Sequence, residues 1–275
     1  MDKLKILLIG CGNMGGSLLE GIVKSHDNFN LIDVVDPVID ESNKSNLKKS
    51  KINFYSDIKE LKNIITYDSI IIATKPNNYD EILKDLNNHI TITEDTLIIS
   101  ILAGIKLKKI ENIIGFVPII RAMPNIAASV AEGMTALIGN KKLTDDKIET
   151  ANMIFQSIGN KIWLEDEGQM DSFTAISGSG PAYFFYFTEC LYKIAIDEGF
   201  SEDTARQISE QIMIGSGKLI KDSNIDVVQL RENVTSPNGT TEAALRVLCD
   251  DDGLLSKLKE AIKKAKKRSI EIANS

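Results

Sequence analysis

The feature that most constrains the fold is a glycine-rich hexapeptide directly after a short apolar run near the start of the chain. Residues 4–9 read LKILLI, and the next six residues, GCGNMG, match the pattern GxGxxG. A short Leu- and Ile-rich run that ends in a turn predicts a buried β-strand, and residues 14–24 continue with a helical pattern. Strand, glycine turn and helix in this order favour a dinucleotide site, where backbone N–H groups face the phosphates.

The three glycines of the motif are expected to have different roles. Gly10 permits a tight turn, Gly12 lets the backbone approach a pyrophosphate, and Gly15 lets the helix pack close to the strand. The alternative is an ordinary strand–turn–helix that uses glycine for geometry alone. Cys11 is interpreted as a small buried side chain rather than a reactive thiol. The predicted cofactor contacts in this loop are Gly10, Cys11, Gly12, Asn13, Met14 and Gly15.

The rest of the chain divides into two patterns. Short apolar runs at 31–35, 69–73 and 97–101 alternate with helical segments such as 79–87, and further strands are expected at 117–121, 134–138 and 161–164. This alternation predicts an α/β, Rossmann-type doubly wound sheet over residues 1–164. From 165 to 275 helical periodicity predominates, which predicts an all-α second domain. Pro181 is expected to begin a helix that stops at Gly199, and Ser201 to cap the next one.

Composition limits the possible partners. The 275 residues carry a net charge of −7, and no basic stripe of the kind that binds nucleic acid is apparent. No apolar run has the length of a membrane span, and no signal segment is recognised, so we expect a cytoplasmic protein. Cys11, Cys190 and Cys249 are too few and too scattered for a disulfide framework or a metal site. His26 and His89 are the only histidines, and both lie in polar stretches, so a catalytic histidine is not expected.

Ligands of doubly wound sheets bind at the carboxyl ends of the strands, so the residues there are candidate cofactor contacts. Asp36 follows the second strand, 21 positions after Gly15, where a carboxylate accepts hydrogen bonds from the adenosine ribose. This predicts a preference for NADH over NADPH, although Ser42, Lys44, Ser45 and Lys48 could hold a phosphate, and Asp36 could merely end the strand. The other candidates are Ser56, Ala73, Thr74, Lys75, Pro76, Ala103 and Gly104. Lys75 is equally consistent with a solvated loop lysine.

Three further motifs resist a purely structural interpretation. They are RAMPN at 121–125, SGSGPAY at 177–183 and TSPNGTTE at 235–242. Each of the last two is interpreted as a small-residue loop leading into a helix, and such a loop can bind a carboxylate. On spacing alone, helix capping by Ser179 or Thr240 is favoured over a binding role.

With these motifs in place, the chain resembles the pyrroline-5-carboxylate reductase family from Lys3 nearly to its last residue. The resemblance rests on IGCGNMG, on TKP at 74–76, on RAMPN, on SGSGPAY and on SPNGTTEAAL at 236–245, in matching order. It implies NAD(P)H-dependent reduction of 1-pyrroline-5-carboxylate to proline. It also implies an intertwined dimer formed by the helical domain, with larger rings of dimers common in the family.

The resemblance also assigns site residues. It implies that Thr241 is the catalytic side chain, through a hydrogen bond to the substrate nitrogen. The substrate is expected to contact Ser177, Ser179, Ser236, Pro237, Asn238, Gly239, Thr240 and Thr241. Asn238 departs from the more usual glycine, but asparagine tolerates a positive φ. The alternatives are a β-hydroxyacid-type dehydrogenase, for which Lys193 is too far along its helix, and a non-catalytic NAD(P)-sensing protein.

The segment 183–196 gives an independent reason to expect a dimer. It begins Tyr-Phe-Phe-Tyr-Phe and is apolar on nearly all sides, so it must be buried on all sides. About 110 residues of helix form a thin domain that can hardly cover it alone. The alternative is a central helix in a monomeric bundle.

Overall fold

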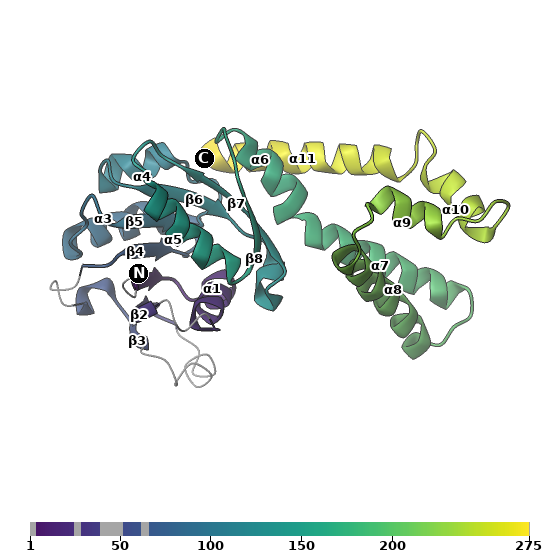
Figure 1. Ribbon diagram of the computed structural model, residues 1–275, viewed down its shortest axis with the longest axis horizontal. Coiled ribbons are helices and arrows are strands. Elements are labelled where there is room, and N and C mark those ends of the chain that lie inside the picture. The colour runs from purple at the N-terminus through teal and green to yellow at the C-terminus, as the bar shows by residue number, and fades with distance from the viewer. Residues whose placement is uncertain (1–3, 25–28, 39–51, 62–65, 275) are drawn as a thin grey trace. The chain divides into compact units, whose positions relative to one another are not determined.

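A computed structural model describes residues 4–24, 29–38, 52–61 and 66–274 (Figure 1). The chain forms two compact units, one built from Met1–Gly178 with Lys266–Ser275 and the other from Ser179–Ala265. We refer to them as the sheet unit and the helical unit. The last strand ends at Trp163, beside the boundary predicted at 164, yet the segment 169–178 still belongs to the sheet unit.

The described residues of the sheet unit form one eight-stranded sheet in the order β3-β2-β1-β4-β5-β6-β7-β8. All neighbouring strands are parallel except β6 and β7, which pair antiparallel. The first six strands therefore have the 3-2-1-4-5-6 order of a doubly wound nucleotide-binding fold, which confirms the predicted fold class. The strands are β1 (Leu4–Ile9), β2 (Phe29–Val35), β3 (Ile52–Tyr55), β4 (Ser69–Ile72), β5 (Leu97–Ser100), β6 (Ile119–Met123), β7 (Gly133–Gly139) and β8 (Gly159–Trp163).

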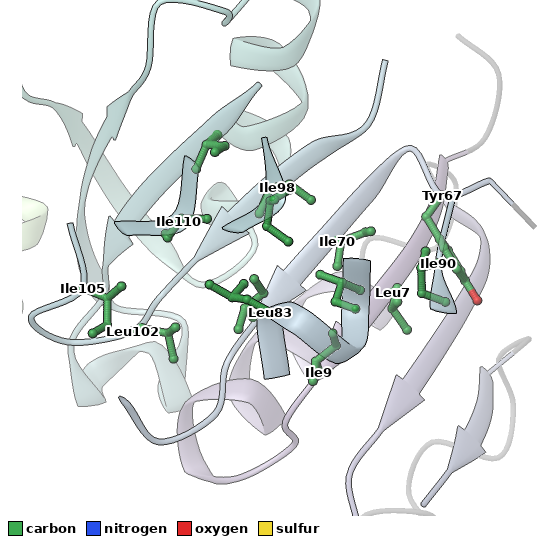
Figure 2. Packing of buried hydrophobic residues seen from close by; sticks show 14 of the residues in the cluster. Leu7, Ile9, Tyr67, Ile70, Leu83, Ile90, Ile98, Leu102, Ile105 and Ile110 are labelled. Atoms are coloured by element: carbon green, nitrogen blue, oxygen red, sulfur yellow. The ribbon is translucent and has the colours of Figure 1, made fainter. Parts of the chain in front are cut away.

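Each face of the sheet has its own hydrophobic cluster because side chains alternate along a strand. Leu7 and Ile9 of β1 face helices α3 and α4, as Figure 2 shows in part, and Ile6 and Leu8 face α1 and α5. Burial on both faces explains the continuous apolar strand sequences. The helices are α1 (Asn13–Lys24), α3 (Tyr79–His89), α4 (Leu107–Ile114) and α5 (Asp145–Gln156), with 3₁₀ turns at Ile58–Glu60, Pro76–Asn78 and Ile126–Val130.

One carboxylate is fully buried within this core. Asp33 in β2 accepts hydrogen bonds from the Tyr67 hydroxyl at 2.6 Å and from Asn53 Nδ2 at 2.8 Å. Burial, followed by the hydrogen bond to Asp33, raises the pKa of Tyr67. The two donors compensate Asp33 for the loss of water, and they connect β2 to edge strand β3 and to the segment before β4.

The helices after the sheet follow closely on one another. A short α6 (Gln169–Phe173) continues into a π-helical turn (Thr174–Gly178), after which α7 (Gly180–Asp197) begins. Gly199, with φ +90°, follows the end of α7, and the Ser201 side chain caps α8 (Glu202–Asp222), so both predicted boundary signals are confirmed. The remaining helices are α9 (Val227–Asn233), α10 (Thr240–Leu248) and α11 (Leu254–Asn274).

The helical unit has almost no hydrophobic core of its own. Its only buried residues are Gly180, Ala195, Ala205 and Ser209. Large apolar side chains of every helix in this unit are exposed, among them Phe184, Phe185, Tyr186, Ile194, Ile214, Leu219, Val227, Val247 and Leu255. So many exposed large apolar side chains are typical of an interaction site and not of a free monomer.

The end of α11 belongs to the sheet unit. Ala273 is buried there, and Lys109 Nζ donates to its carbonyl oxygen at 3.4 Å. A Cβ added to Gly104, which has φ +77°, would lie 3.0 Å from Ile272 Cγ2 and 3.3 Å from the Ala273 backbone. The Ser269 hydroxyl also donates to Asp171 Oδ1 at 2.6 Å. The final turn of α11 therefore packs on the loop that follows β5.

Across the residues that the structure describes, the helices lack the combination of length and apolarity needed to cross a bilayer.

Candidate cofactor and substrate sites

The glycine loop has the geometry that its sequence predicts. Gly10 has φ +92°, and a Cβ there would lie 2.7 Å from the Ala73 carbonyl oxygen. A Cβ on Gly15 would lie 2.1 Å from the Gly10 carbonyl oxygen, whereas one on Gly12 would meet no protein atom within 4 Å. Gly10 and Gly15 thus allow strand and helix to pack closely, and Gly12 leaves open space beside the backbone. That open space is where a pyrophosphate would lie.

A cavity of about 340 Å³ adjoins this loop, at the start of α1. The free N–H groups of a helix start favour an anion, and α1 carries no acidic residue in its first turn. The lining residues are Cys11, Gly12, Asn13, Gly16, Ser17, Glu20 and Val38.

Asp36 lies directly beside the glycine loop. Its Oδ2 accepts a hydrogen bond from the Cys11 backbone N–H at 2.6 Å, and its Oδ1 accepts one from the Val38 N–H at 2.8 Å. These two bonds fix the carboxylate at the carboxyl end of β2, the location predicted from sequence. Each oxygen retains a lone pair for a ribose hydroxyl. The alternative phosphate ligands Ser42, Lys44, Ser45 and Lys48 lie outside the described residues, as does His26.

The Cys11 thiol is not suited to chemistry. Burial, with smaller contributions from Asp36 and Glu20, raises its pKa to about 11. The thiol is therefore protonated at neutral pH and a poor nucleophile.

The strand ends bring the other predicted cofactor residues to the same edge of the sheet. The Ala73 N–H donates to the Ile9 carbonyl at 2.7 Å, which places Ala73 to Pro76 beside the glycine loop. Among the described residues, the Thr74 hydroxyl is buried and has no hydrogen-bond partner, so it is available to a ligand. The Ser56 hydroxyl is already engaged by Glu60. Ala103 and Gly104 follow β5, next to the final turn of α11.

The RAMPN motif holds the segment after the sheet in place. Buried Arg121 pairs with Glu167, with 2.9 Å between Nη1 and Oε1, and the same carboxylate oxygen accepts the N–H of Leu107 at the start of α4. Asn125 binds Ser177, 52 positions away. The motif is recognisable in the sequence, but its partners Glu167 and Ser177 are not.

Both capping predictions are wrong. Ser177 and Ser179 lie in or beside a π-helical turn rather than in an open loop, and the Ser179 side chain makes no capping bond. Thr240 is the first residue of α10, and Gly239 occupies the cap position. The side chains of Ser179 and Thr240 are therefore not occupied by helix capping, and a role in binding remains open to them.

The segment 236–241 forms a compact turn within the helical unit. Asn238 has φ +59°, the positive value expected of an asparagine replacing glycine, and its N–H donates to Glu242 Oε2 at 2.7 Å. The Gly239 N–H donates to the Ser236 carbonyl at 3.0 Å. Half-buried Thr241 lies in the first turn of α10, where N–H groups lack helical partners. The start of α10 thus combines the hydroxyls of Thr240 and Thr241 with backbone N–H groups that have no helical partner, as a carboxylate site requires.

Comparisons with known proteins agree with this description. The profile for pyrroline-5-carboxylate reductase dimerisation matches residues 167–272, and that for coenzyme F420-dependent NADP oxidoreductase matches residues 5–104. A pyrroline-5-carboxylate reductase of Pseudomonas aeruginosa is 31% identical over 99% of this chain and 98% of its own length.

Two solved structures are also similar. The enzyme of Coxiella burnetii is 31% identical with a TM-score of 0.89, covering 98% of this chain and 99% of that one. The Plasmodium falciparum enzyme with NADP bound is 28% identical with a TM-score of 0.80, covering 99% of both chains. The chain belongs to the pyrroline-5-carboxylate reductase family.

Proposed function

We propose that this protein reduces 1-pyrroline-5-carboxylate to proline with a nicotinamide cofactor. The observation that carries the proposal is the coexistence, in one chain, of an open glycine loop and a hydroxyl-rich turn on the family's dimerisation unit. The residues proposed to hold the cofactor are Gly10, Cys11, Gly12, Asn13, Met14, Gly15, Asp36, Ser56, Ala73, Thr74, Lys75, Pro76, Ala103 and Gly104. When bound, the nicotinamide supplies a hydride.

Thr241 is the proposed catalytic residue. Its hydroxyl holds and polarises the imine nitrogen of the substrate, which is basic enough to arrive protonated or to take a proton from solvent. A histidine base is therefore unnecessary. The substrate is held by Ser177, Ser179 and the turn Ser236, Pro237, Asn238, Gly239, Thr240 and Thr241, where the hydroxyls and the N–H groups at the start of α10 suit a carboxylate.

The cofactor proposed for this chain is NADH in preference to NADPH. The Asp36 carboxylate offers acceptors to the two ribose hydroxyls and repels a 2′-phosphate. Glu20 adds a second negative charge to the same cavity.

The proposed assembly is a homodimer formed through the helical unit, which explains the exposed apolar side chains of α7 to α11. A ring of such dimers is proposed as the larger assembly. Light scattering separates the possibilities, and a stable monomer at micromolar concentration would refute the dimer. The three free thiols are compatible with the reducing cytoplasm, where we place the protein.

The activity is tested by following NADH and NADPH oxidation with pyrroline-5-carboxylate as the substrate. Turnover that requires this imine would support the proposal. Cofactor binding without turnover would instead indicate the NAD(P)-sensing alternative. The β-hydroxyacid dehydrogenase alternative is less favoured, because Lys193 near the end of α7 is paired with Glu189 at 2.6 Å and points into solvent.

A further inference from the structure

Between α6 and α7, the carbonyl oxygen of Ser177 lacks the hydrogen-bond donor that a regular α-helix would provide. In an α-helix the carbonyl of residue i accepts the N–H of residue i+4. The residue four positions after Ser177 is Pro181, which has no N–H. The π turn Thr174–Gly178 precedes this proline, and π turns occur frequently at functional sites. The Ser177 carbonyl therefore needs a donor from elsewhere.

Asn125 supplies that donor. Its Nδ2 lies 3.1 Å from the Ser177 carbonyl oxygen and 3.4 Å from the Ser177 hydroxyl. Its Oδ1 accepts the backbone N–H of Met134 at 3.3 Å. Because a backbone N–H can only donate, the amide oxygen must face Met134 and the NH₂ group must face Ser177. The amide is thus fixed in one orientation between β7 and the π turn.

The placement of Asn125 points to a dedicated role. It occupies the cap position of the 3₁₀ turn Ile126–Val130, where asparagine ordinarily binds its own helix, yet it makes no capping bond. Its side chain is directed to Ser177 and Met134 instead, and the residue is only 9% exposed. The buried amide has both its donor and its acceptor in use.

We propose that Asn125 is a positioning residue for the reaction: its amide holds the Ser177 carbonyl that Pro181 leaves without a helical donor, and so orients Ser177 toward the substrate. This inference rests on the proposed function, which assigns Ser177 to substrate binding. Asn125 itself touches neither substrate nor cofactor in this scheme. Loss of the Asn125 amide therefore displaces Ser177, which binds the substrate, but removes no substrate-binding residue.

The perturbation is Asn125→Asp in the full-length protein. The substitution keeps the size and the acceptor for the Met134 N–H but replaces the NH₂ donor by a carboxylate oxygen that repels the Ser177 carbonyl. We expect kcat/KM for pyrroline-5-carboxylate to fall by about tenfold or more, the effect of losing one hydrogen bond. We expect KM for NADH to remain within about twofold, because the side-chain hydrogen bonds of Asn125 go to Ser177 and Met134, neither of which is a proposed cofactor contact.

Two further measurements separate positioning from general destabilisation. Hydrogen exchange should accelerate in 174–180 and remain unchanged in the strands. The matched control is Arg121→Met, which breaks the other contact of the same motif, the ion pair with Glu167. It should lower the unfolding midpoint without a selective loss in substrate kcat/KM.

A double-mutant comparison tests the role of the proline directly. Pro181→Ala restores an N–H four residues after Ser177, so Asn125→Asp should reduce kcat/KM less in a Pro181→Ala background than in the wild type. Equal losses of kcat/KM in the wild-type and Pro181→Ala backgrounds would overturn the proposal. So would unchanged kinetics of Asn125→Asp, or parallel losses of kcat/KM for NADH and for the substrate. Failure of Asn125→Asp to fold would also overturn it. A wild type without reductase activity would refute the proposed function instead, and the exchange rates would still decide whether Asn125 holds the turn.

Discussion

Replacing Asp36 by serine should invert the cofactor preference. The change removes a carboxylate that is fixed by the N–H groups of Cys11 and Val38 at the carboxyl end of β2. Because both bonds come from the backbone, the carboxylate is ordered before the cofactor binds. NADH then forms its ribose hydrogen bonds without having to order this side chain.

Two contributions set the size of the effect. A hydrogen bond to an ionised carboxylate is worth about 1.5–3 kcal/mol to NADH. A doubly charged 2′-phosphate about 5 Å from the carboxylate is repelled by about 1.5 kcal/mol at the dielectric constant of water, reduced by salt to about 1 kcal/mol. Together they amount to about 2.5–4 kcal/mol, a change of about 70- to 900-fold in the ratio of the two kcat/KM values.

The assay is the ratio of kcat/KM for NADH to that for NADPH in the wild type and in Asp36→Ser. Asp36→Asn keeps one acceptor without the charge and should give an intermediate ratio. The charge control is Glu20→Gln, which should change the ratio by less than about threefold, because Glu20 is exposed and screened and lies 3.9 Å from Lys24. A wild type that favours NADPH, or a ratio that serine leaves unaltered, would refute the assignment of Asp36.

Four other substitutions have expected outcomes. Thr241→Ala should fold normally and lose about ten- to several-hundred-fold in kcat, and wild-type turnover would remove Thr241 from the mechanism. Tyr67→Phe leaves buried Asp33 with one side-chain donor, so urea unfolding should show a loss of about 1.5–3 kcal/mol; a loss below about 0.5 kcal/mol would contradict this role. A methyl at Gly15 would meet a backbone carbonyl oxygen at 2.1 Å, so Gly15→Ala should lower both the unfolding midpoint and NADH affinity. Gly12→Ala, with no protein atom within 4 Å, should lower only the affinity, and equal midpoints for the two variants would count against the packing argument.

Local requirements were predictable from the sequence. The positive φ of Gly10 and the close packing of Gly15 follow from a strand, a turn and a helix that are contiguous in the chain. Asp36 was placed by counting from Gly15. Edge strand β3 was missed, because INFY is short and half exposed and lacks the continuous apolar run of the buried strands.

Long-range partnerships were not predictable in the same way. Arg121 and Glu167 are 46 positions apart, and no pattern around either residue indicates that the other is its partner. For Ser177 the sequence does contain one signal. The proline four residues later has no N–H, which indicates that the Ser177 carbonyl must accept a hydrogen bond from a residue elsewhere in the chain. The capping prediction at Ser179 failed because its side chain makes no hydrogen bond to α7, although Ser179 occupies the cap position. The prediction at Thr240 failed because α10 begins one residue earlier than the spacing indicated, so Gly239 occupies the cap position.

The return of α11 to the sheet unit has a consequence for synthesis. Ile272 and Ala273 at the end of α11 pack on the loop after β5, yet the ribosome makes them only after the whole helical unit. The nascent sheet unit can form its strands early, but the loop with Ala103 and Gly104 stays uncovered until the end of α11 emerges. The surroundings of Gly104, one of the proposed cofactor contacts, are therefore completed only after the helical unit has been synthesised.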